Sequence, residues 1–519
     1  MRRRDRPAAG SARVGAGRAP RASVLGLLLC VLCLGALLRF HQLDAQSLWN
    51  DELSTWVQSH HETLAEVIEV GVRPTPYPPG FQILIWWVER HVGESEVALR
   101  MPSAVAGVLA ILAIFLLGRE MYGEREGLLA AAVLAVSYQP LYYSQEARAY
   151  SLLLLSAIVS GLFWLRVQRA LEGGGRPGVA TCVAYVASAG AMMYLHYFGL
   201  LLAVVQVGGL LALFALRPRA LAWAAGLAAA LAALYLPWLP HFLEEFGSQP
   251  VYLPVPGLGA IARHWRWLFY DPTGALAWAT LAVFAVAIGR WLWLRRRRAE
   301  RGGAWRALAT SPTALLTAWL VVPFAFAFVR SLTSAPILND RNLIIGLPAA
   351  HLLFARAITT ALPRPALQLA AAGAVAALML HGIFVTGAYY DFPRKNQFRE
   401  AAAVVAAHEA RTPDARVVAW AWNRAYFDYY LARQGSSLRV DLVAGAPSDV
   451  PVLREFLARE RPRHLWVLVG HRILSPEVTA WLERELAFVA HQPLFGAAAI
   501  LYRVPRAGDA ESDRAPPTP

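Results

Sequence analysis

Long apolar runs separated by short polar segments occupy the first three quarters of the sequence. They fall near residues 24–39, 101–118, 127–143, 150–165, 179–195, 198–216, 220–237, 273–294, 313–329, 343–358 and 366–388. A helix needs about 20 mainly apolar residues to cross a bilayer. The pattern therefore predicts a polytopic α-helical membrane part of about 11 transmembrane helices within residues 24–390.

The pattern changes after residue 390, where hydropathy drops and charged residues return. The segments RVVAWAW, LRVDLV and HLWVLVG are typical of short strands, and they alternate with the helical stretches PVLREFLARERP and SPEVTAWLEREL. LAFVAH and AAILYRV complete the pattern as a closing hairpin. We expect a C-terminal α/β domain over residues 391–505, followed by a disordered, Pro-rich tail over 506–519.

Composition agrees with the membrane prediction. Of the 519 residues, 57% are hydrophobic and 16% are charged. A soluble domain carries about 25% charged residues. These figures exclude a wholly water-soluble protein, intrinsic disorder and a coiled coil.

The net charge of +14 suggests a nucleic-acid partner until the charges are placed along the chain. Lys395 is the only lysine, so the excess is almost entirely arginine. A basic segment, 1–23, precedes the first apolar run, and every second connection between runs contains Arg, including Arg295–Arg298. The positive-inside tendency then predicts a cytoplasmic N-terminus, an extracytoplasmic first loop over 40–100 and an extracytoplasmic C-terminal domain in the inner (cell) membrane. We expect no nucleic-acid partner.

Charged and polar residues from distant parts of the sequence are predicted on one, outer, face. They are Asp51, Glu52, Arg100, Glu146, Arg148, His196 and Arg341. Charged groups at a membrane boundary are costly unless they are paired or functional. Carboxylates with several arginines suit chemistry on an anionic, lipid-borne substrate, because guanidinium groups bind phosphate bidentately.

Structural explanations compete with these functional ones. Asn50 or Asp51 is suited to cap a helix that begins at ELSTWVQ. Glu146 and Arg148 are suited to pair with each other, and Asp340 is the obvious partner of Arg341. Prolines in RPTPYPPG exclude a helix before about Gly80, and the Trp86–Trp87 pair that follows suits an interfacial helix.

Together, SLWNDELSTW, ALRMPSAVAG, LYYSQEARAYSLLLL, YLHYFGLLL and NDRNLIIGLPA resemble the GT-C glycosyltransferases. Within that superfamily the set is similar to bacterial family 39, which includes relatives of protein O-mannosyltransferases and of the aminoarabinose transferase of lipid A. The resemblance covers residues 24–390. It implies transfer of a sugar from a polyprenyl-phosphate-linked donor to an acceptor hydroxyl on a lipid, glycan or protein, with inversion at the anomeric carbon.

The resemblance also implies residue roles. Asp51 is expected as the general base, with Glu52 as its supporting neighbour and Glu146 as a second acidic group that positions an acceptor or a metal. The donor phosphate is expected to bind Arg148 and Arg341. Arg100 is added to them because an arginine at the outer mouth of a membrane helix runs against the positive-inside tendency and invites an anionic partner. The candidate substrate-binding residues are His196, Tyr197 and Tyr77, although relatives often have His-Pro-Pro where this chain has Tyr77-Pro78-Pro79.

A divalent metal ion is left open, because no His, Asp and Glu cluster has diagnostic spacing. Two other classes of function also remain open. A transporter or flippase of lipid-linked saccharides would place charges at mid-membrane in two related halves. A non-catalytic assembly partner would use the α/β domain and its aromatic stretch WAWNRAYFDYY, 420–430, although that stretch is more typical of a packed core.

Overall fold

The computed structural model describes residues 21–213, 217–248, 253–270, 273–298, 311–444 and 449–505. Most of the basic N-terminal segment, the side chains of Arg295–Arg298 and the tail 506–519 lie outside the described residues, so the predictions made for them are not tested.

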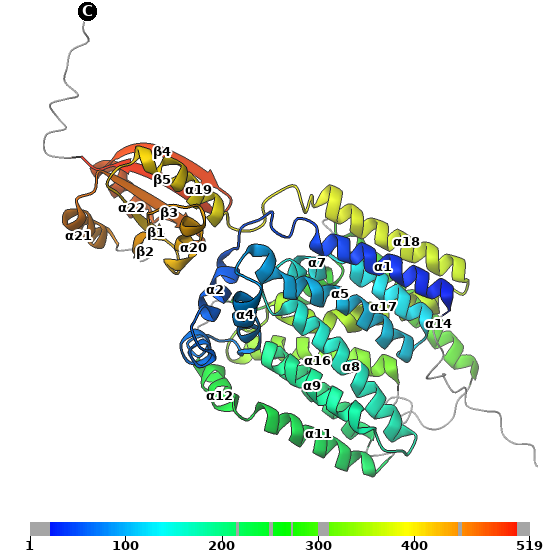
Figure 1. The fold of residues 1–519 in the computed structure, drawn as a ribbon. Coiled ribbons are helices and arrows are strands. Elements are labelled where there is room, and N and C mark those ends of the chain that lie inside the picture. Colours follow the sequence, from blue (N-terminus) through cyan, green and yellow to red (C-terminus); the bar gives the residue numbers. More distant parts are fainter. Residues whose placement is uncertain are drawn as a thin grey trace, which may run out of the picture.

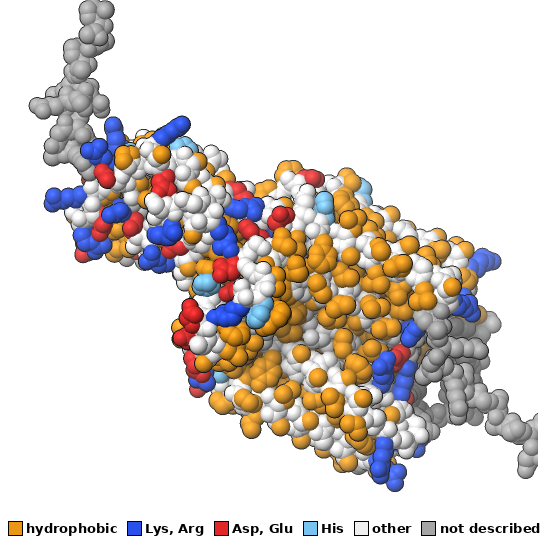
Figure 2. All heavy atoms as spheres, in the orientation of Figure 1, with side chains coloured by type: hydrophobic (Ala, Val, Ile, Leu, Met, Phe, Trp, Pro, Cys, Tyr) orange, Lys and Arg blue, Asp and Glu red, His pale blue; other side chains and the backbone are white. Residues whose placement is uncertain are grey.

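A bundle of apolar helices forms the larger part of the molecule (Figure 1). Its helices are α1 (Ala22–Phe40), α5 (Glu96–Met121), α6 (Glu124–Val136), α7 (Tyr138–Ser144), α8 (Tyr150–Glu172), α9 (Val179–Leu195), α10 (Phe198–Ala212), α11 (Arg219–Tyr235), α14 (Ala275–Arg298), α16 (Pro312–Thr333), α17 (Leu347–Ala361) and α18 (Pro365–His381). On the face shown in Figure 2, hydrophobic side chains spread over the bundle between its two ends. The chain is therefore a multi-pass membrane protein.

Each apolar run predicted from the sequence coincides with helical structure. Seven helices of the described part are long and apolar enough to cross a membrane, or eight if the bent pair α11 and α12 (Leu239–Ser248) is one span. Helices α9 and α10 are apolar but shorter. The count of 11 spans stays a prediction.

Run 127–143 is interrupted, because α6 ends at Val136 and α7 begins at Tyr138. Helix ends leave carbonyl groups without intrahelical partners. Buried Arg39 of α1 donates from Nη1 to the Ala135 carbonyl at 2.9 Å and from Nη2 to the Leu134 carbonyl at 3.1 Å. The break in the helix is thus satisfied by an arginine from a neighbouring span.

A second group of short elements lies at one end of the bundle, which we call the domain-bearing end. The segment between α1 and α5 forms α2 (Asn50–Ser59), α3 (Leu64–Glu66), the π-helical turn η1 (Val67–Val72) and α4 (Gly80–His91). Helix α4 begins at Gly80, directly after the prolines, as predicted. The remaining short helices are α13 (Gly259–Leu268), η3 (Asp340–Gly346) and η4 (Gly382–Thr386).

The α/β domain contains a five-stranded sheet of order β2-β1-β3-β5-β4. Its strands are β1 (Ala415–Trp420), β2 (Val440–Ala444), β3 (His464–Gly470), β4 (Ala487–Leu494) and β5 (Ala497–Arg503). Strand β1 pairs in parallel with β2 and β3, and the antiparallel β4–β5 hairpin extends the sheet beyond β3. The predicted strands and closing hairpin are present.

Helices cover both faces of this sheet. They are α19 (Phe398–His408) and α20 (Ala425–Arg433) on one face, and α21 (Val450–Glu460) and α22 (Pro476–Glu485) on the other. Alternate strand residues face the two cores: Val417 and Ala419 pack with α19 and α20, whereas Val418 and Trp420 pack with α21 and α22. The short turn η5 (Glu409–Arg411) follows α19.

The core under α19 and α20 continues into the segment between α1 and α5. Leu53 of α2 and Phe81 and Ile85 of α4 belong to the same buried cluster as Phe427 and Tyr430 of α20. Ser47 Oγ donates to the Asn396 carbonyl at 2.6 Å, and the Leu48 amide donates to the Tyr430 hydroxyl at 2.6 Å. The α/β domain is therefore packed directly onto the helices that carry the candidate site.

Candidate functional site

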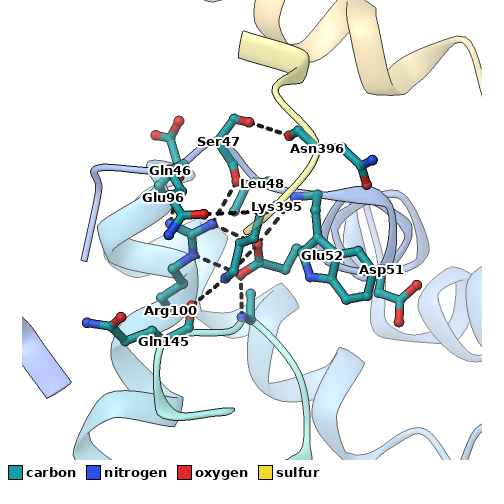
Figure 3. A network of polar contacts seen from close by, with 12 residues as sticks. Gln46, Ser47, Leu48, Asp51, Glu52, Glu96, Arg100, Gln145, Lys395 and Asn396 are labelled. Atoms are coloured by element: carbon teal, nitrogen blue, oxygen red, sulfur yellow. Dashed lines mark hydrogen bonds and ion pairs between the residues drawn. The ribbon is translucent and has the colours of Figure 1, made fainter. Parts of the chain in front are cut away.

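The first turn of α2 carries the two adjacent carboxylates. The helix begins at Asn50, one residue earlier than a cap at Asn50 or Asp51 allows, so the capping prediction is wrong. Trp49 has extended backbone at the N-cap, and its amide donates to Glu52 Oε2 at 3.3 Å. Because Glu52 turns back toward the helix start, its carboxylate points away from that of Asp51 (Figure 3).

Glu52 is the centre of a buried network (Figure 3). Its side chain is fully buried and pairs with Arg100 Nη2 of α5 at 2.7 Å and with Lys395 Nζ at 3.2 Å. The amide of Ala147 donates to Glu52 Oε1 at 2.7 Å. Glu52 thus joins α2, α5, the turn between α7 and α8, and the linker to the α/β domain.

Burial and neighbouring charges shift the pKa of Glu52 in opposite directions. Burial raises the pKa, but the charges of Arg100 and then Lys395 outweigh it and lower the pKa of Glu52 to about 2. Burial, with the charge of Arg100, lowers the pKa of Lys395 to about 8. Lys395 Nζ also donates to the Gln145 carbonyl at 2.6 Å. The carboxylate and the ammonium are both charged at neutral pH, as a buried pair requires.

Arg100 uses all its donors within this network. Nε and Nη2 donate to the two oxygens of Glu52, and the remaining bonds go to the carbonyls of Leu43, Gln46 and Ser47. A guanidinium has five N–H groups, and these five bonds account for them. This geometry favours a positioning role for Arg100 over the predicted contact with a phosphate.

Asp51 faces a second pair of arginines. Arg341 Nη1, from η3, lies 2.9 Å from Asp51 Oδ2 across 290 residues of sequence. Arg148 Nη1 donates to the Asp51 carbonyl at 3.3 Å and to Thr55 Oγ1 at 3.0 Å. Burial raises the pKa of Asp51, but the charges of Arg148 and Arg341 outweigh it and hold the pKa below its ordinary value.

Neither structural pairing predicted for these arginines is formed. Among the described residues, no ion pair joins Glu146 to Arg148; Arg148 instead contacts α2 and lies over the Tyr77 ring, 4.9 Å from its centroid. Asp340 pairs with His264 Nδ1 at 2.9 Å rather than with Arg341. Both arginines therefore turn toward α2, because Asp340 has its own partner and Thr55 and Asp51 accept from Arg148.

Glu146 lies behind the two carboxylates in the turn between α7 and α8. It is 1% exposed, and its Oε1 atom has no hydrogen-bond partner within the described part of the chain. Burial raises the pKa of Glu146 to about 7, against the charge of Lys395. A carboxyl with such a pKa exchanges a proton near neutral pH, which suits a general acid or base.

A small pocket opens beside Arg148. Its lining includes Tyr77, Pro78, Gln82, Tyr150 and His196. Burial, followed by the charges of Arg148 and Arg341, lowers the pKa of His196 to about 3, so its ring is neutral at pH 7. The structure thus brings two of the three predicted substrate-binding residues to Arg148.

Tyr197 lies elsewhere. Its hydroxyl accepts from Trp238 Nε1 at 3.3 Å, and its ring packs on Phe242 of α12 at 5.0 Å. The peptide turns between His196 and Tyr197, so adjacent residues point to different surroundings. Tyr197 therefore packs against the bend between α11 and α12 and not beside Arg148.

The described residues do not form a metal site, since no group of three or more His, Cys, Asp or Glu side chains is arranged to hold an ion. The carboxylates at this site have arginine or lysine neighbours instead.

Reasoning from the sequence missed Lys395 and Tyr426. Lys395 had one signal, since it is the only lysine of the chain. Tyr426 of α20 is buried, and its hydroxyl bonds the Ser54 side chain beside Asp51 and Arg148. No local pattern marks it, because its role depends on how α20 docks on α2.

Part of the chain is similar in sequence to a known family. Residues 76–241 match the family model described as dolichyl-phosphate-mannose-protein mannosyltransferase. This segment includes Tyr77, Arg100, Glu146, Arg148 and His196. A search of curated proteins finds no significant match.

Solved structures have the same fold. ArnT from Cupriavidus metallidurans, bound to undecaprenyl phosphate, superposes with a TM-score of 0.53 at 14% identity, over 92% of this chain and 98% of that one. The apo oligosaccharyltransferase of Archaeoglobus fulgidus superposes with a TM-score of 0.50 at 12% identity, over 93% of this chain and 75% of that one. The likeness covers the bundle and the α/β domain together. The GT-C fold implied by the sequence resemblance is confirmed, and the assignment to family 39 stays a prediction.

Proposed function

We propose that this chain, which has the fold of the GT-C glycosyltransferases, transfers a sugar from a polyprenyl-phosphate-linked donor to an acceptor hydroxyl. The observation that carries the proposal is the Asp51 carboxylate paired with Arg341, with Arg148 bonded to the main-chain carbonyl of Asp51, at the domain-bearing end of a membrane bundle. One carboxylate and two guanidinium groups supply a proton acceptor and an anion site side by side.

Arg148 and Arg341 would bind the phosphate of the donor. The Arg341 side chain is 33% exposed, so a ligand can reach its guanidinium. Its Nε atom has no hydrogen-bond partner among the described residues. As the bond between the anomeric carbon and the phosphate oxygen breaks, negative charge grows on the departing phosphate. Fixed cations there stabilise the transition state more than the ground state.

Asp51 would take the proton of the acceptor hydroxyl while the acceptor oxygen bonds to the anomeric carbon on the face opposite the leaving phosphate. This displacement inverts the anomeric carbon. Before the donor binds, Arg341 weakens Asp51 as a base by pairing with it. A donor phosphate that competes for Arg341 releases the carboxylate, so the base becomes stronger when the leaving group is in place.

Glu52, Arg100 and Lys395 would act as positioning residues. Their bonds fix the first turn of α2, and Asp51 is the residue before Glu52. Glu146, buried beside them, is placed to adjust the charge of the site or to carry a proton near pH 7.

We further propose that the domain-bearing end is extracytoplasmic, in the inner membrane, with the N-terminus in the cytoplasm. Basic side chains at the opposite end of the bundle support this orientation (Figure 2). The acceptor is a hydroxyl on a lipid, glycan or protein. A transporter or flippase is less well supported, because the charged cluster lies at one end of the bundle and not at its middle.

Mass spectrometry of envelope glycans from cells with and without the gene tests the proposal. We expect loss of one sugar from one glycan, lipid or protein in the deletion strain. Restoration by the wild-type gene but not by Asp51→Asn supports Asp51 as the base. Asp44→Asn, an exposed carboxylate in the same loop, is the matched control and should restore the sugar. An unchanged profile in the deletion strain contradicts the proposed function.

A further inference from the structure

Three large apolar side chains are exposed at one end of the sheet in the α/β domain. Trp422 is 57% exposed, Ile473 is 92% exposed and Phe495 is 50% exposed. Trp422 follows β1, Ile473 follows β3, and Phe495 lies in the turn between β4 and β5. We call these three residues the tip patch. Strands β1, β3 and β4 run in one direction, so their carboxyl ends meet at one end of the sheet.

This end of the sheet faces the membrane bundle (Figure 1). Gly496, beside Phe495, accepts at its carbonyl from the His471 amide at 3.1 Å and from Asn396 Nδ2 of the linker at 2.9 Å. The ring of His471 lies 6.4 Å from that of Trp49, the residue before α2. The tip patch is thus adjacent to the connection between the two parts of the molecule.

The exposure of Trp422 contrasts with the burial of the strand that precedes it. Trp420, two residues before Trp422, is 2% exposed. The Arg472 guanidinium lies over the Trp422 ring, 4.1 Å from its centroid. Tryptophan is enriched at membrane–water interfaces, because its ring is apolar and its N–H group is polar. An arginine and exposed apolar side chains beside it suit the same location. Clustered apolar exposure of this kind marks an interaction surface.

Exposed apolar residues also lie along the chain that leads from the last span to the domain. Val385, in η4 at the end of that span, is 64% exposed, and Phe392 in the linker is 65% exposed. Because η4 is the end of the last candidate membrane span, Pro365–Thr386, Val385 lies at the boundary of the bilayer. Phe392 follows it in the linker that leads to the α/β domain.

We propose that the tip patch inserts into the headgroup region of the adjacent leaflet, so that the α/β domain rests on the bilayer as well as on α2 and α4. Arg472 meets lipid phosphate while Trp422, Ile473 and Phe495 reach the acyl boundary. This second attachment restrains the linker that delivers Lys395 to Glu52. The inference rests on the membrane fold and stands apart from the sugar chemistry.

Site-directed spin labelling in lipid vesicles tests this contact. Cys30, Cys33 and Cys182 are free cysteines and are first replaced by Ser. One label is then attached at Ile473→Cys, and a second protein carries it at Phe488→Cys. Phe488 is 60% exposed near the start of β4, about 20 Å from Phe495 along the strand at about 3.3 Å per residue. It is the matched control for exposed apolar character.

In vesicles of phosphatidylethanolamine and phosphatidylglycerol, we expect the Ile473 label to be accessible to oxygen and shielded from a water-soluble nickel complex. The Phe488 label should show the opposite accessibility. Equal nickel accessibility at both positions overturns the proposal. Low accessibility of the Ile473 label to both oxygen and nickel also overturns it, because a protein contact and not the bilayer then covers the patch. A Trp422→Cys label gives an independent reading of the same surface.

Discussion

Two neighbouring carboxylates have different surroundings and therefore different expected roles. Glu52 is fully buried and forms ion pairs with Arg100 and Lys395. The side chain of Asp51 is 19% exposed and pairs with Arg341. Their separation arises because Glu52 caps the start of α2 and turns inward. Chemistry is expected at the residue that a ligand can reach.

Replacing Arg341 by Gln tests the anion site at the level of single residues. We expect kcat/KM to fall by about 100-fold or more, the size typical of losing one group that stabilises transition-state charge. Because Arg341 lowers the pKa of Asp51, the acid limb of the kcat/KM profile should move to higher pH in the variant than in the wild type. Steady-state assays with a lipid-linked donor measure both effects.

Arg263→Gln is the matched control, since Arg263 is 62% exposed and contacts Asp340 at 3.6 Å. Its kinetics should equal those of the wild type. Unchanged kinetics in Arg341→Gln would show that Arg341 does not bind the donor.

The stability of the Glu52 network depends on pH. The pKa of Glu52 is about 2 in the folded protein and 4.5 in an ordinary peptide. Its contribution of about 3 kcal/mol is present above pH 4.5 and is lost as pH falls toward 2. Glu52→Gln should lower the melting temperature at pH 7, because Arg100 and Lys395 lose their buried counter-charge. It should also remove part of the pH dependence below 4.5.

Thermal unfolding of the purified protein in detergent measures these effects. Glu69→Gln is the matched control, because it makes the same substitution at another glutamate between α1 and α5. Glu69 is 55% exposed, so its replacement should shift the melting temperature little. Equal melting temperatures for the two variants contradict a central structural role for Glu52.

At the scale of elements, close helix contacts fix the frame on which the site is built. A Cβ on Gly127 of α6 would lie 2.5 Å from the Phe115 carbonyl oxygen, and one on Gly118 of α5 would lie 2.7 Å from the Gly127 Cα. Such small residues let membrane helices approach closely. This contact joins α5, which carries Arg100, to α6, which leads into α7 and then Glu146.

Gly127→Ala should therefore destabilise the protein by about 1–3 kcal/mol, because the backbone of α5 must move to admit the methyl group. Gly226→Ala is the control, since nothing lies within 4 Å of a Cβ at that position of α11. We expect Gly226→Ala to be neutral or slightly stabilising. Differential scanning fluorimetry compares the two, and equal melting temperatures would show that α5 and α6 are not closely fitted in solution.

At the scale of the whole molecule, the α/β domain completes the membrane site. It covers α2 and α4 with a shared core and supplies Lys395 to Glu52 from its linker. The α/β domain therefore shares its core with the helices that carry the candidate site. Its linker contacts Glu52, which bonds the start of α2.

Lys395→Met tests this dependence, because the substitution keeps most of the buried volume and removes the charge. We expect a lower melting temperature and a fall in kcat with a smaller change in the KM for the donor, since Lys395 does not face Arg148 or Arg341. Arg411→Met, at an exposed position of the same domain, is the control. Wild-type stability and kcat in Lys395→Met would contradict the proposed coupling between the domain and α2.

Much of this architecture follows from local sequence. Apolar run length determines the membrane helices, since a bilayer requires a minimum apolar length, and alternation of apolar residues determines the strands of the α/β domain. Arginine bias and the Asp-Glu and SQEARAY motifs also pointed to Asp51, Glu52, Glu146 and Arg148, but no local pattern pointed to Lys395 or Tyr426 as part of the candidate site. Those signals are local, because each depends on a few neighbouring positions.

Only the tertiary structure decided which charges meet. Asp51 pairs with Arg341 at a separation of 290 residues, and Glu52 pairs with Lys395 at a separation of 343. Sequence proximity favoured Glu146 with Arg148 and Asp340 with Arg341, and both pairings fail. The physical reason is that ion pairs are set by distance and burial after the helices and the α/β domain have packed, and neither quantity is encoded in spacing along the chain.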